Sequence, residues 1–316
     1  MSFSCSPLSG NWCASAMFPN VSKRSSAYYQ ATLATCVVTA LFAPLTAVAN
    51  APFILAAVWK NPSLRTPSYV LLAGLAFTDF CTGLITQPFF VALRLGDGVI
   101  NKHKYFITGL AADGVRYYFL SLTFFVITMI AVERWLHMSR RSLLTVRRVI
   151  SIYIMFAVFL ILVAAGTLYT RYIQSEAFKV IAAFCVSVGA LCIAVTVFAY
   201  FKVFRIIRHH QNQVQVNGNA LDMKKYKRSF FTILYILAVF VLSYVPSLCV
   251  ILAFHAFSNH TTPYYVASEV CAAVVLSSSL INPLLYYWRI KEIRDTVKRI
   301  IRKLLCKQNG DGSGQF

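Results

Sequence analysis

Residues 121–135 read SLTFFVITMIAVERW, an apolar run that ends in an adjacent acid and base, Glu133 and Arg134. The run is apolar enough to lie in lipid, where an arginine at the centre of a helix costs roughly 2.5–3.5 kcal/mol. At the end of a span the side chain reaches the interface and costs less. Glu133 is the local partner for Arg134. The stretch therefore predicts a membrane helix that ends in a Glu–Arg pair at the membrane boundary.

The composition supports the same class of protein. The 316 residues are 58% hydrophobic and 13% charged, with a mean hydropathy of +0.65. A soluble domain of this size cannot bury so much apolar surface. The net charge of +20 does not indicate nucleic-acid binding, because the basic residues lie in short blocks between apolar runs. The nine cysteines are scattered singly, so neither a zinc site nor a disulfide scaffold is expected.

The apolar runs predict an all-α membrane protein, a seven-transmembrane-helix bundle. We expect residues 1–27 to form an N-terminal segment, residues 28–288 the bundle, and residues 289–316 an amphipathic eighth helix with a tail. The predicted spans are Tyr28–Trp59, Ser68–Leu93, Tyr105–His137, Val149–Thr170, Ala177–Phe204, Phe230–Phe257 and Tyr264–Trp288.

Basic residues set the expected orientation. They concentrate in the loops after the odd-numbered spans and in the tail, which places the tail in the cytoplasm and the N-terminus outside. Two sequons, at Asn20 and Asn259, then fall on the outer side and predict N-glycosylation. The tail helix is expected to lie on anionic membrane lipid, with Cys306 either palmitoylated or an ordinary exposed thiol.

Polar residues stand at regular places inside the spans. Asp79 lies near the middle of the second span, Asn50 lies in the first, and Pro246 lies in the sixth. The seventh span ends in Asn282-Pro283-Leu284-Leu285-Tyr286. Together with Glu133-Arg134-Trp135, this ordered set resembles the rhodopsin-like (class A) G-protein-coupled receptors over roughly residues 28–306.

The resemblance implies two groups of functional residues. Those of the G-protein coupling and activation switch would be Glu133, Arg134, Tyr200, Phe240, Tyr244, Pro246, Asn282, Pro283 and Tyr286. Those of a polar cavity that holds a sodium ion would be Asp79, Asn50, Thr123, Ser278 and Asn282. The alternative is that these groups only hold helices together, as polar residues in membrane bundles do.

The chain departs from the family pattern at several places. Tyr244 stands where tryptophan is usual, Cys192 where the fifth helix usually has proline, and Gly109 where the third helix usually has a cysteine. The family's common extracellular disulfide is therefore not expected. These features are similar to those of the melanocortin and adenosine-receptor-like branch. Asp113 falls where melanocortin receptors keep a ligand-binding acid, but Phe89 and Gly109 replace the other two acids.

Arg116 is the most informative residue of the expected ligand site. It lies about five turns outward of Arg134, on the same helix face, where the resemblance implies an aspartate in amine receptors. Arg116 could bind a ligand carboxylate or phosphate. The alternative, which we favour, is an internal ion pair with Asp113 or Glu269. The remaining pocket residues expected are Phe89, Tyr117, Phe184, Leu248 and Ile251, for each of which helix packing is an equally good interpretation.

The sequence thus predicts a plasma-membrane receptor that binds an unknown extracellular ligand and activates a heterotrimeric G protein. We expect no enzymatic activity, no nucleic-acid partner and no cofactor other than the sodium ion. The run Lys224-Lys225-Tyr226-Lys227-Arg228 stands where many relatives place an acid that pairs with the motif arginine, which predicts notable basal activity. The alternatives are a signalling-silent heterodimer partner or a membrane transporter.

Overall fold

The computed structural model describes residues 25–59, 66–96, 102–139, 144–173, 177–217, 235, 238–253, 261–289, 294–295, 297–299 and 302. Four predictions fall outside these residues: the glycosylation sites Asn20 and Asn259, palmitoylation at Cys306, and the basic run 224–228. The side chain of Tyr286 lies outside them as well.

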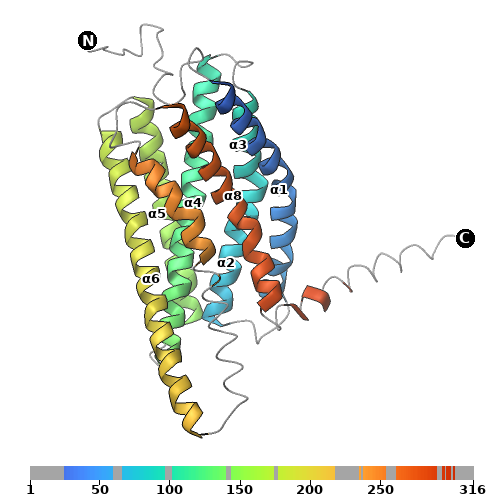
Figure 1. The fold of residues 1–316 in the computed structure, drawn as a ribbon, viewed down its shortest axis with the longest axis vertical. Coiled ribbons are helices and arrows are strands. Elements are labelled where there is room, and N and C mark those ends of the chain that lie inside the picture. Colours follow the sequence, from blue (N-terminus) through green and yellow to red (C-terminus); the bar gives the residue numbers. More distant parts are fainter. Residues whose placement is uncertain are drawn as a thin grey trace, which may run out of the picture.

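Every secondary-structure element in these residues is helical, and the elements form one elongated bundle (Figure 1). The element bounds are α1 Ser26–Trp59, α2 Pro67–Cys81, η4 Thr82–Thr86, α3 Gln87–Leu95, α4 Lys102–Met138, α5 Val146–Tyr172, α6 Ala177–Asn217, the helix Ala238–Ala253, and α8 Thr262–Arg289. Six of the resulting spans are long and apolar enough to cross a membrane, and Ala238–Ala253 is a shorter apolar helix. The predicted seven-helix bundle is confirmed, with α2, η4 and α3 forming one span.

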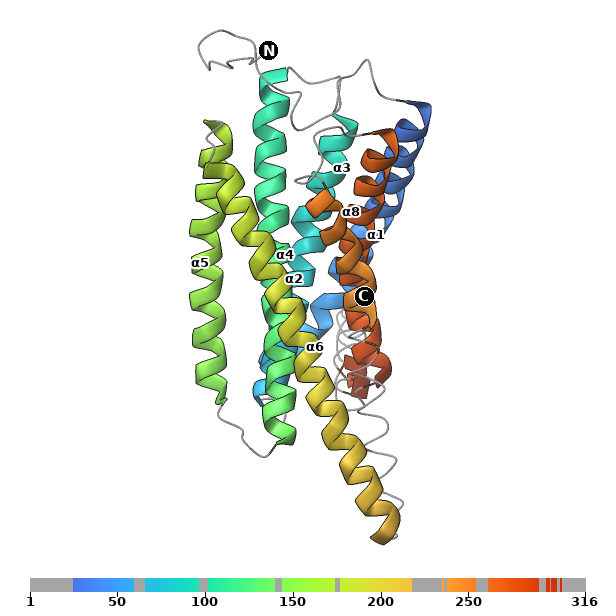
Figure 2. The ribbon, with the colours of Figure 1, turned by 60° about the vertical axis from the view of Figure 1, so that its left-hand side comes forward.

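The fifth helix of the bundle is longer than predicted. α6 runs on to Asn217, well past the expected end at Phe204, and projects beyond its neighbours (Figure 2). Val203 and Ile207 are buried while Arg205 and Arg208 are exposed, so the helix continues as an amphipathic one. A search for apolar runs stops where charges begin, and it therefore misses this part.

A π-helical turn interrupts the second span. Thr82–Thr86 form η4, and the Gln87 N–H donates to the Thr82 carbonyl five residues back. Pro88 follows at the start of α3, and because proline has no N–H, the regular helical ladder cannot pass through it unchanged. The sequence predicted one span here, Ser68–Leu93, and did not foresee this turn. The extra residue in the turn changes which side chains of α3 face the bundle.

Gly83 lets this turn lie directly against α1. A Cβ at Gly83 would lie 2.8 Å from the Ala47 nitrogen and 2.9 Å from the Ala43 carbonyl oxygen, both rigid backbone atoms. Only glycine permits so close an approach. η4 is thereby held at the middle of α1.

The apolar interior lies between α2, α4 and the helix Ala238–Ala253. Its largest cluster includes Leu75, Val126, Ile130 and Phe240, all nearly inaccessible. By contrast, α5 lies at the edge of the bundle (Figure 2). Its apolar side chains are largely exposed, Met155 and Leu162 among them. Such a surface is suited to lipid rather than to water.

In the tail, the described residues 294–295, 297–299 and 302 are helical. Val297 is buried against the largest apolar cluster, whereas Lys298 and Arg299 beside it are exposed. This alternation fits the predicted amphipathic eighth helix. Its limits and its contact with lipid stay predictions.

Candidate functional site

Three clusters of polar residues lie at different depths of the bundle. They are a cluster around Asp79, the pair Glu133–Arg134, and two ion pairs that involve Arg94 and Arg116. We call the end at which α1 begins the first end, and the end at which α8 finishes the second end (Figure 1). Asp79 lies between them and is fully buried. Its Oδ2 accepts a hydrogen bond of 2.8 Å from Nδ2 of Asn282, which ties α2 to α8.

Asn50 makes a second tie at the same depth. Its Nδ2 donates to the Thr46 carbonyl at 2.9 Å and to the Ser279 carbonyl at 3.1 Å, which joins α1 to α8. Ser278 of α8 contacts the neighbouring helix Ala238–Ala253 instead. Its Oγ donates to the Val275 carbonyl at 2.7 Å and lies within hydrogen-bonding distance, 3.4 Å, of the Tyr244 hydroxyl.

The residues around Asp79 fit a small hard cation. Oδ1 of Asp79 and Oδ1 of Asn50 are buried, and neither has a hydrogen-bond partner among the residues that the structure describes. One carboxylate oxygen and one amide oxygen are ligands that hard cations prefer. Thr123 of α4 is buried as well. Within the described ranges no three His, Cys, Asp or Glu residues lie together as a metal-binding group.

At the second end, Glu133 and Arg134 lie side by side but bind unequally. Glu133 is 3% exposed, and its Oε1 accepts a 2.7 Å hydrogen bond from the Ser68 hydroxyl of α2. The other oxygen, Oε2, lies 3.9 Å from Nε of Arg134, too far for a hydrogen bond. The Arg134 side chain is 34% exposed. The acid is thus hydrogen-bonded to α2, whereas its contact with Arg134 is an ion pair without a hydrogen bond.

Tyr200 of α6 lies next to this pair. Its ring is buried in a cluster with Ala131 and Val203, against which Trp135 packs. The Tyr200 hydroxyl is buried and has no hydrogen-bond partner in the described part of the chain, and it is close enough to Arg134 to feel that charge. The predicted switch residues Arg134 and Tyr200 are therefore neighbours.

An aromatic group fixes the sixth helix of the bundle. The Phe124 ring of α4 makes edge-on contacts with Phe240 at 5.3 Å and with Tyr244 at 4.7 Å between ring centroids. Phe240 and Tyr244 are buried, whereas Pro246 is exposed on the same helix. Pro283 lies buried inside α8. The Tyr244 hydroxyl thereby reaches Ser278 of α8.

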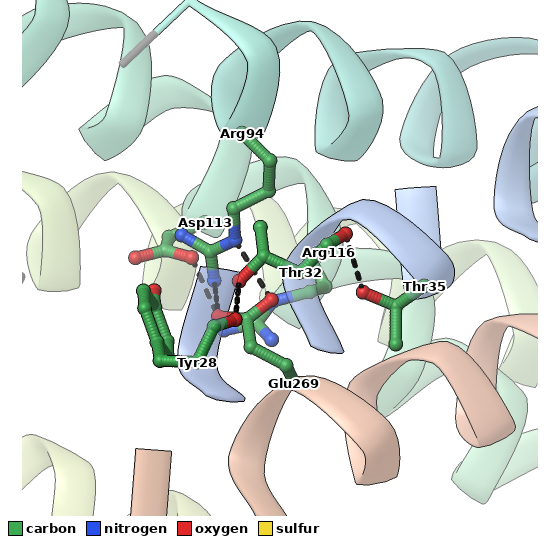
Figure 3. Close-up of polar contacts among 7 residues, drawn as sticks. All are labelled: Tyr28, Thr32, Thr35, Arg94, Asp113, Arg116 and Glu269. Atoms are coloured by element: carbon green, nitrogen blue, oxygen red, sulfur yellow. Dashed lines mark hydrogen bonds and ion pairs between the residues drawn. The ribbon is translucent and has the colours of Figure 1, made fainter. Parts of the chain in front are cut away.

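Two ion pairs lie together near the first end, beside Tyr28, Thr32 and Thr35 of α1 (Figure 3). Arg94 of α3 binds Glu269 of α8 twice, with Nη2 2.7 Å from Oε1 and Nε 3.0 Å from Oε2. Nη2 of Arg116 lies 3.1 Å from Oδ1 of Asp113, one turn away on α4. This second pair is the internal one that the sequence favoured, but Glu269 pairs with Arg94 rather than with Arg116.

Arg94 was not among the expected site residues, because the predicted second span ends one residue before it, at Leu93. The structure places it in the last turn of α3, with a side chain only 16% exposed. The sequence did contain a signal for this ion pair. A buried glutamate such as Glu269 requires a cation, and Arg94 directly follows the predicted second span. The four charges cancel, so this cluster is neutral as a whole.

Of the remaining predicted ligand residues, Tyr117 contacts one ion pair, with the Arg116 guanidinium carbon 5.1 Å from its ring centroid. The cavity beside the ion pairs is large enough for roughly one water molecule. Of the predicted ligand residues, only Asp113 and Arg116 line it; its walls are Thr86, Phe90, Leu93, Arg94, Ala112, Asp113 and Arg116. Phe89, Tyr117 and Phe184 are 46%, 38% and 54% exposed, and Leu248 and Ile251 are half-buried. For these five residues a ligand role stays a prediction.

Comparison with known proteins places most of the bundle, residues 50–286, in one family. The model of the 7 transmembrane receptor (rhodopsin family) matches residues 50–286. The chain is 23% identical to human sphingosine 1-phosphate receptor 2, over 82% of this chain and 73% of that protein. It is 23% identical to human lysophosphatidic acid receptor 3, over 78% of this chain and 73% of that protein.

A shorter match, 30% identical, covers 34% of this chain and 32% of chicken (Gallus gallus) adenosine receptor A2b. Membership of the melanocortin and adenosine-receptor-like branch stays a prediction. The family is one of multi-pass membrane receptors and not of enzymes. The match over residues 50–286, with the helices and buried motifs described above, shows that the chain belongs to the rhodopsin family of seven-transmembrane receptors.

Proposed function

We propose that this receptor lies in the plasma membrane with its first end outside, binds an extracellular ligand there, and activates a heterotrimeric G protein at its second end. The observation that carries the proposal is the state of Arg134. Its guanidinium is partly exposed at the second end, and only an attraction over 3.9 Å holds it to Glu133. A cation so loosely held can exchange one partner for another.

The orientation is supported by the basic residues of the second end. Arg147 and Arg148 begin α5 there, and Arg205 and Arg208 are exposed on the projecting part of α6. Membrane proteins keep such clusters on the cytoplasmic side. A G protein would meet Arg134 on this face.

Buried polar groups with more than one available partner support a two-state bundle. The Tyr200 hydroxyl and Oε2 of Glu133 are both buried without a hydrogen bond in the described residues. Unsatisfied groups of this kind are costly, so a rearrangement that satisfies them gains free energy. Ligand binding would shift the population toward that arrangement.

The ion at Asp79 would act on the same equilibrium. We propose that Na⁺ binds Oδ1 of Asp79 and Oδ1 of Asn50, with water completing its shell. A cation there supplies charge compensation to a fully buried carboxylate. It would favour the arrangement in which Asp79, Asn50 and Asn282 stay together.

The ligand is not selected by charge alone. Two arginines and two carboxylates balance in the cluster at the first end. Two relatives are named for phosphate-bearing lipids, sphingosine 1-phosphate and lysophosphatidic acid, and a third for adenosine. A ligand panel therefore begins with lysophospholipids and continues with nucleosides, amines and peptides.

The test measures G-protein dissociation in transfected cells across this panel, at matched surface expression. We expect at least one G-protein class to respond to the wild type and Arg134→Ala to abolish the response. Arg147→Ala, another arginine at the second end, is the control and retains it. A wild type that is silent with every G protein at full surface expression would instead indicate the signalling-silent partner.

A further inference from the structure

The small cavity beside the two ion pairs of the first end has a wall that is not electrically neutral. Its charged wall residues are Arg94, Asp113 and Arg116. Two arginines against one carboxylate leave the wall with one positive charge in excess. Glu269, which balances Arg94 in the wider cluster, is not part of this wall. The space beside the two cations therefore favours a negative charge.

Thr86 of η4 lines the same cavity with a hydroxyl that has no other bond. The residue is 3% exposed, and its Oγ1 is buried without a hydrogen-bond partner among the residues that the structure describes. Two other threonines of this span bond within their own helix, since Thr78 donates to the Gly74 carbonyl and Thr82 to the Thr78 carbonyl, both at 3.0 Å. Buried hydroxyls rarely lack a partner, so the partner of Thr86 is to be sought in the cavity.

Arg116 also has donors to spare. In the described part of the chain its guanidinium donates through Nη2 alone, to Oδ1 of Asp113 at 3.1 Å. A guanidinium carries more N–H groups than one such contact uses, and it accepts no hydrogen bond. The Arg116 side chain is 28% exposed, so an ion can reach it from the first end. Arg116 and Thr86 can thus both donate to an acceptor placed between them.

The rest of the wall is apolar and fixes the size of what can bind. Phe90, Leu93 and Ala112 are all buried there, which keeps bulk water away and strengthens the attraction between charges. The cavity has room for roughly one water-sized species. A carboxylate, phosphate or sulfate group has several heavy atoms and does not fit whole. Charge and size together therefore select a single-atom anion.

We propose that this cavity binds a chloride ion, held by the guanidinium groups of Arg94 and Arg116 and by the Thr86 hydroxyl. A halide accepts hydrogen bonds from N–H and O–H groups and offsets the excess charge of the wall, whereas a neutral water molecule leaves that charge in place. The ion would join η4 and α3 of the second span to α4 of the third. It would do so at the end of the bundle where Gly109 stands in place of the family's disulfide cysteine.

The melting temperature of purified receptor in sodium chloride and in sodium gluconate of equal concentration tests the proposal. Both salts supply the same sodium concentration and the same ionic strength, so the Asp79 site and general screening do not differ between them. A ligand that binds only the folded state stabilises it, and we expect chloride to raise the melting temperature by about 2–4 °C. The rise should saturate with chloride concentration, and bromide should replace chloride. Equal melting temperatures in chloride and gluconate would overturn the proposal.

Variants of the two threonines locate the ion. Thr86→Val keeps the shape of the side chain without its hydroxyl, and the chloride concentration for half of the effect should rise severalfold; Thr86→Ser should restore it. The control Thr82→Val removes a hydroxyl that already bonds within the helix and should keep the wild-type chloride dependence. A chloride dependence unchanged by Thr86→Val would place the ion elsewhere and contradict this site. If Thr86→Val does not fold, Arg116→Gln, which removes the excess positive charge, is judged by the same criterion.

A last arm separates the chloride site from the other proposals. Asp79→Asn removes the carboxylate of the sodium site and should keep the full response to chloride. Loss of the chloride response in Asp79→Asn would contradict a separate site at the first end. The inference goes beyond the proposed signalling and does not depend on it, because the measurement uses receptor without G protein. A receptor that chloride stabilises but that activates no G protein would contradict the proposed function alone.

Discussion

Arg94 and Glu269 form a two-bond ion pair across the first end of the bundle, with N–O distances of 2.7 and 3.0 Å. The two side chains are 16% and 5% exposed and come from α3 and α8. This ion pair joins α3, the end of the second span, to α8 of the seventh span. The third helix of this chain has Gly109 where the family pattern has a disulfide cysteine, so the ion pair is well placed to stabilise this end of the bundle.

Glu269→Ala is expected to lower the free energy of unfolding by about 3–5 kcal/mol, because the buried Arg94 loses the carboxylate that binds it at two positions. The matched control is Asp113→Ala, whose pair with Arg116 lies within α4 and is more exposed. Thermal unfolding of purified receptor measures both. Equal losses of stability in the two variants would contradict a special stabilising role for the Arg94–Glu269 pair.

Gly83→Ala is expected to destabilise the bundle, because the new Cβ would press on the backbone of Ala43 and Ala47 at under 3.0 Å. The control is Gly189→Ala on α6, where nothing lies within 4 Å of the added Cβ. That change is expected to be neutral or to stabilise by about 0.5–1 kcal/mol, since alanine favours helix more than glycine does. A melting temperature unchanged by Gly83→Ala would show that η4 does not pack on α1 as described.

Tyr244→Phe removes only the hydroxyl that reaches Ser278 at 3.4 Å. The expected loss of stability is about 0.5–1.5 kcal/mol, the usual net value of one hydrogen bond. Tyr117→Phe, on a ring that is 38% exposed, serves as the control. The ring contacts with Phe124 remain in the Tyr244 variant, so a much larger loss would assign the hydroxyl a further partner.

Glu133→Gln is expected to raise ligand-independent signalling. The amide keeps an oxygen for Ser68 but removes the charge that attracts Arg134. Second-messenger level is measured against receptor density, and the variant should give a steeper line than the wild type. Ser68→Ala, which frees Glu133 but leaves its charge, should change the slope less. A slope unaffected by Glu133→Gln would remove this acid as a restraint on Arg134.

Sodium should stabilise the wild type but not Asp79→Asn. The melting temperature is compared in NaCl and in choline chloride of equal ionic strength, which leaves general screening unchanged. Thr123→Val tests whether the α4 hydroxyl contributes. A wild type with the same melting temperature in both salts has no sodium site under these conditions.

The bundle was predictable because a membrane helix is encoded by length and apolarity alone. Each span from Tyr28 to Trp288 is visible in the sequence without any knowledge of its neighbours. The projecting part of α6 was not, since it carries exposed charges such as Arg205 and Arg208 and continues as an amphipathic helix in which Ile207 is buried. Hydropathy detects burial in lipid and not helix length.

The candidate sites were only partly predictable. Asp79 and Asn282 could be placed together from motif order, and the structure joins them by a 2.8 Å hydrogen bond. Arg94 was missed because the predicted span ended one residue before it, at Leu93, whereas α3 runs on to Leu95. Thr39 Oγ1 and Thr46 Oγ1 are buried without a hydrogen-bond partner among the described residues. This could not be foreseen either, because a sequence does not show which hydroxyls bond within their own helix.

The most direct test of receptor function is nucleotide exchange on purified G proteins by the receptor in lipid vesicles. Wild type, Arg134→Ala and the control Arg147→Ala are compared at equal amounts, without ligand and with any ligand that the cell panel provides. The account predicts that wild type and Arg147→Ala accelerate exchange on at least one G protein, and that Arg134→Ala does not. Exchange by Arg134→Ala at the wild-type rate would contradict the proposed role of Arg134 in activating the G protein.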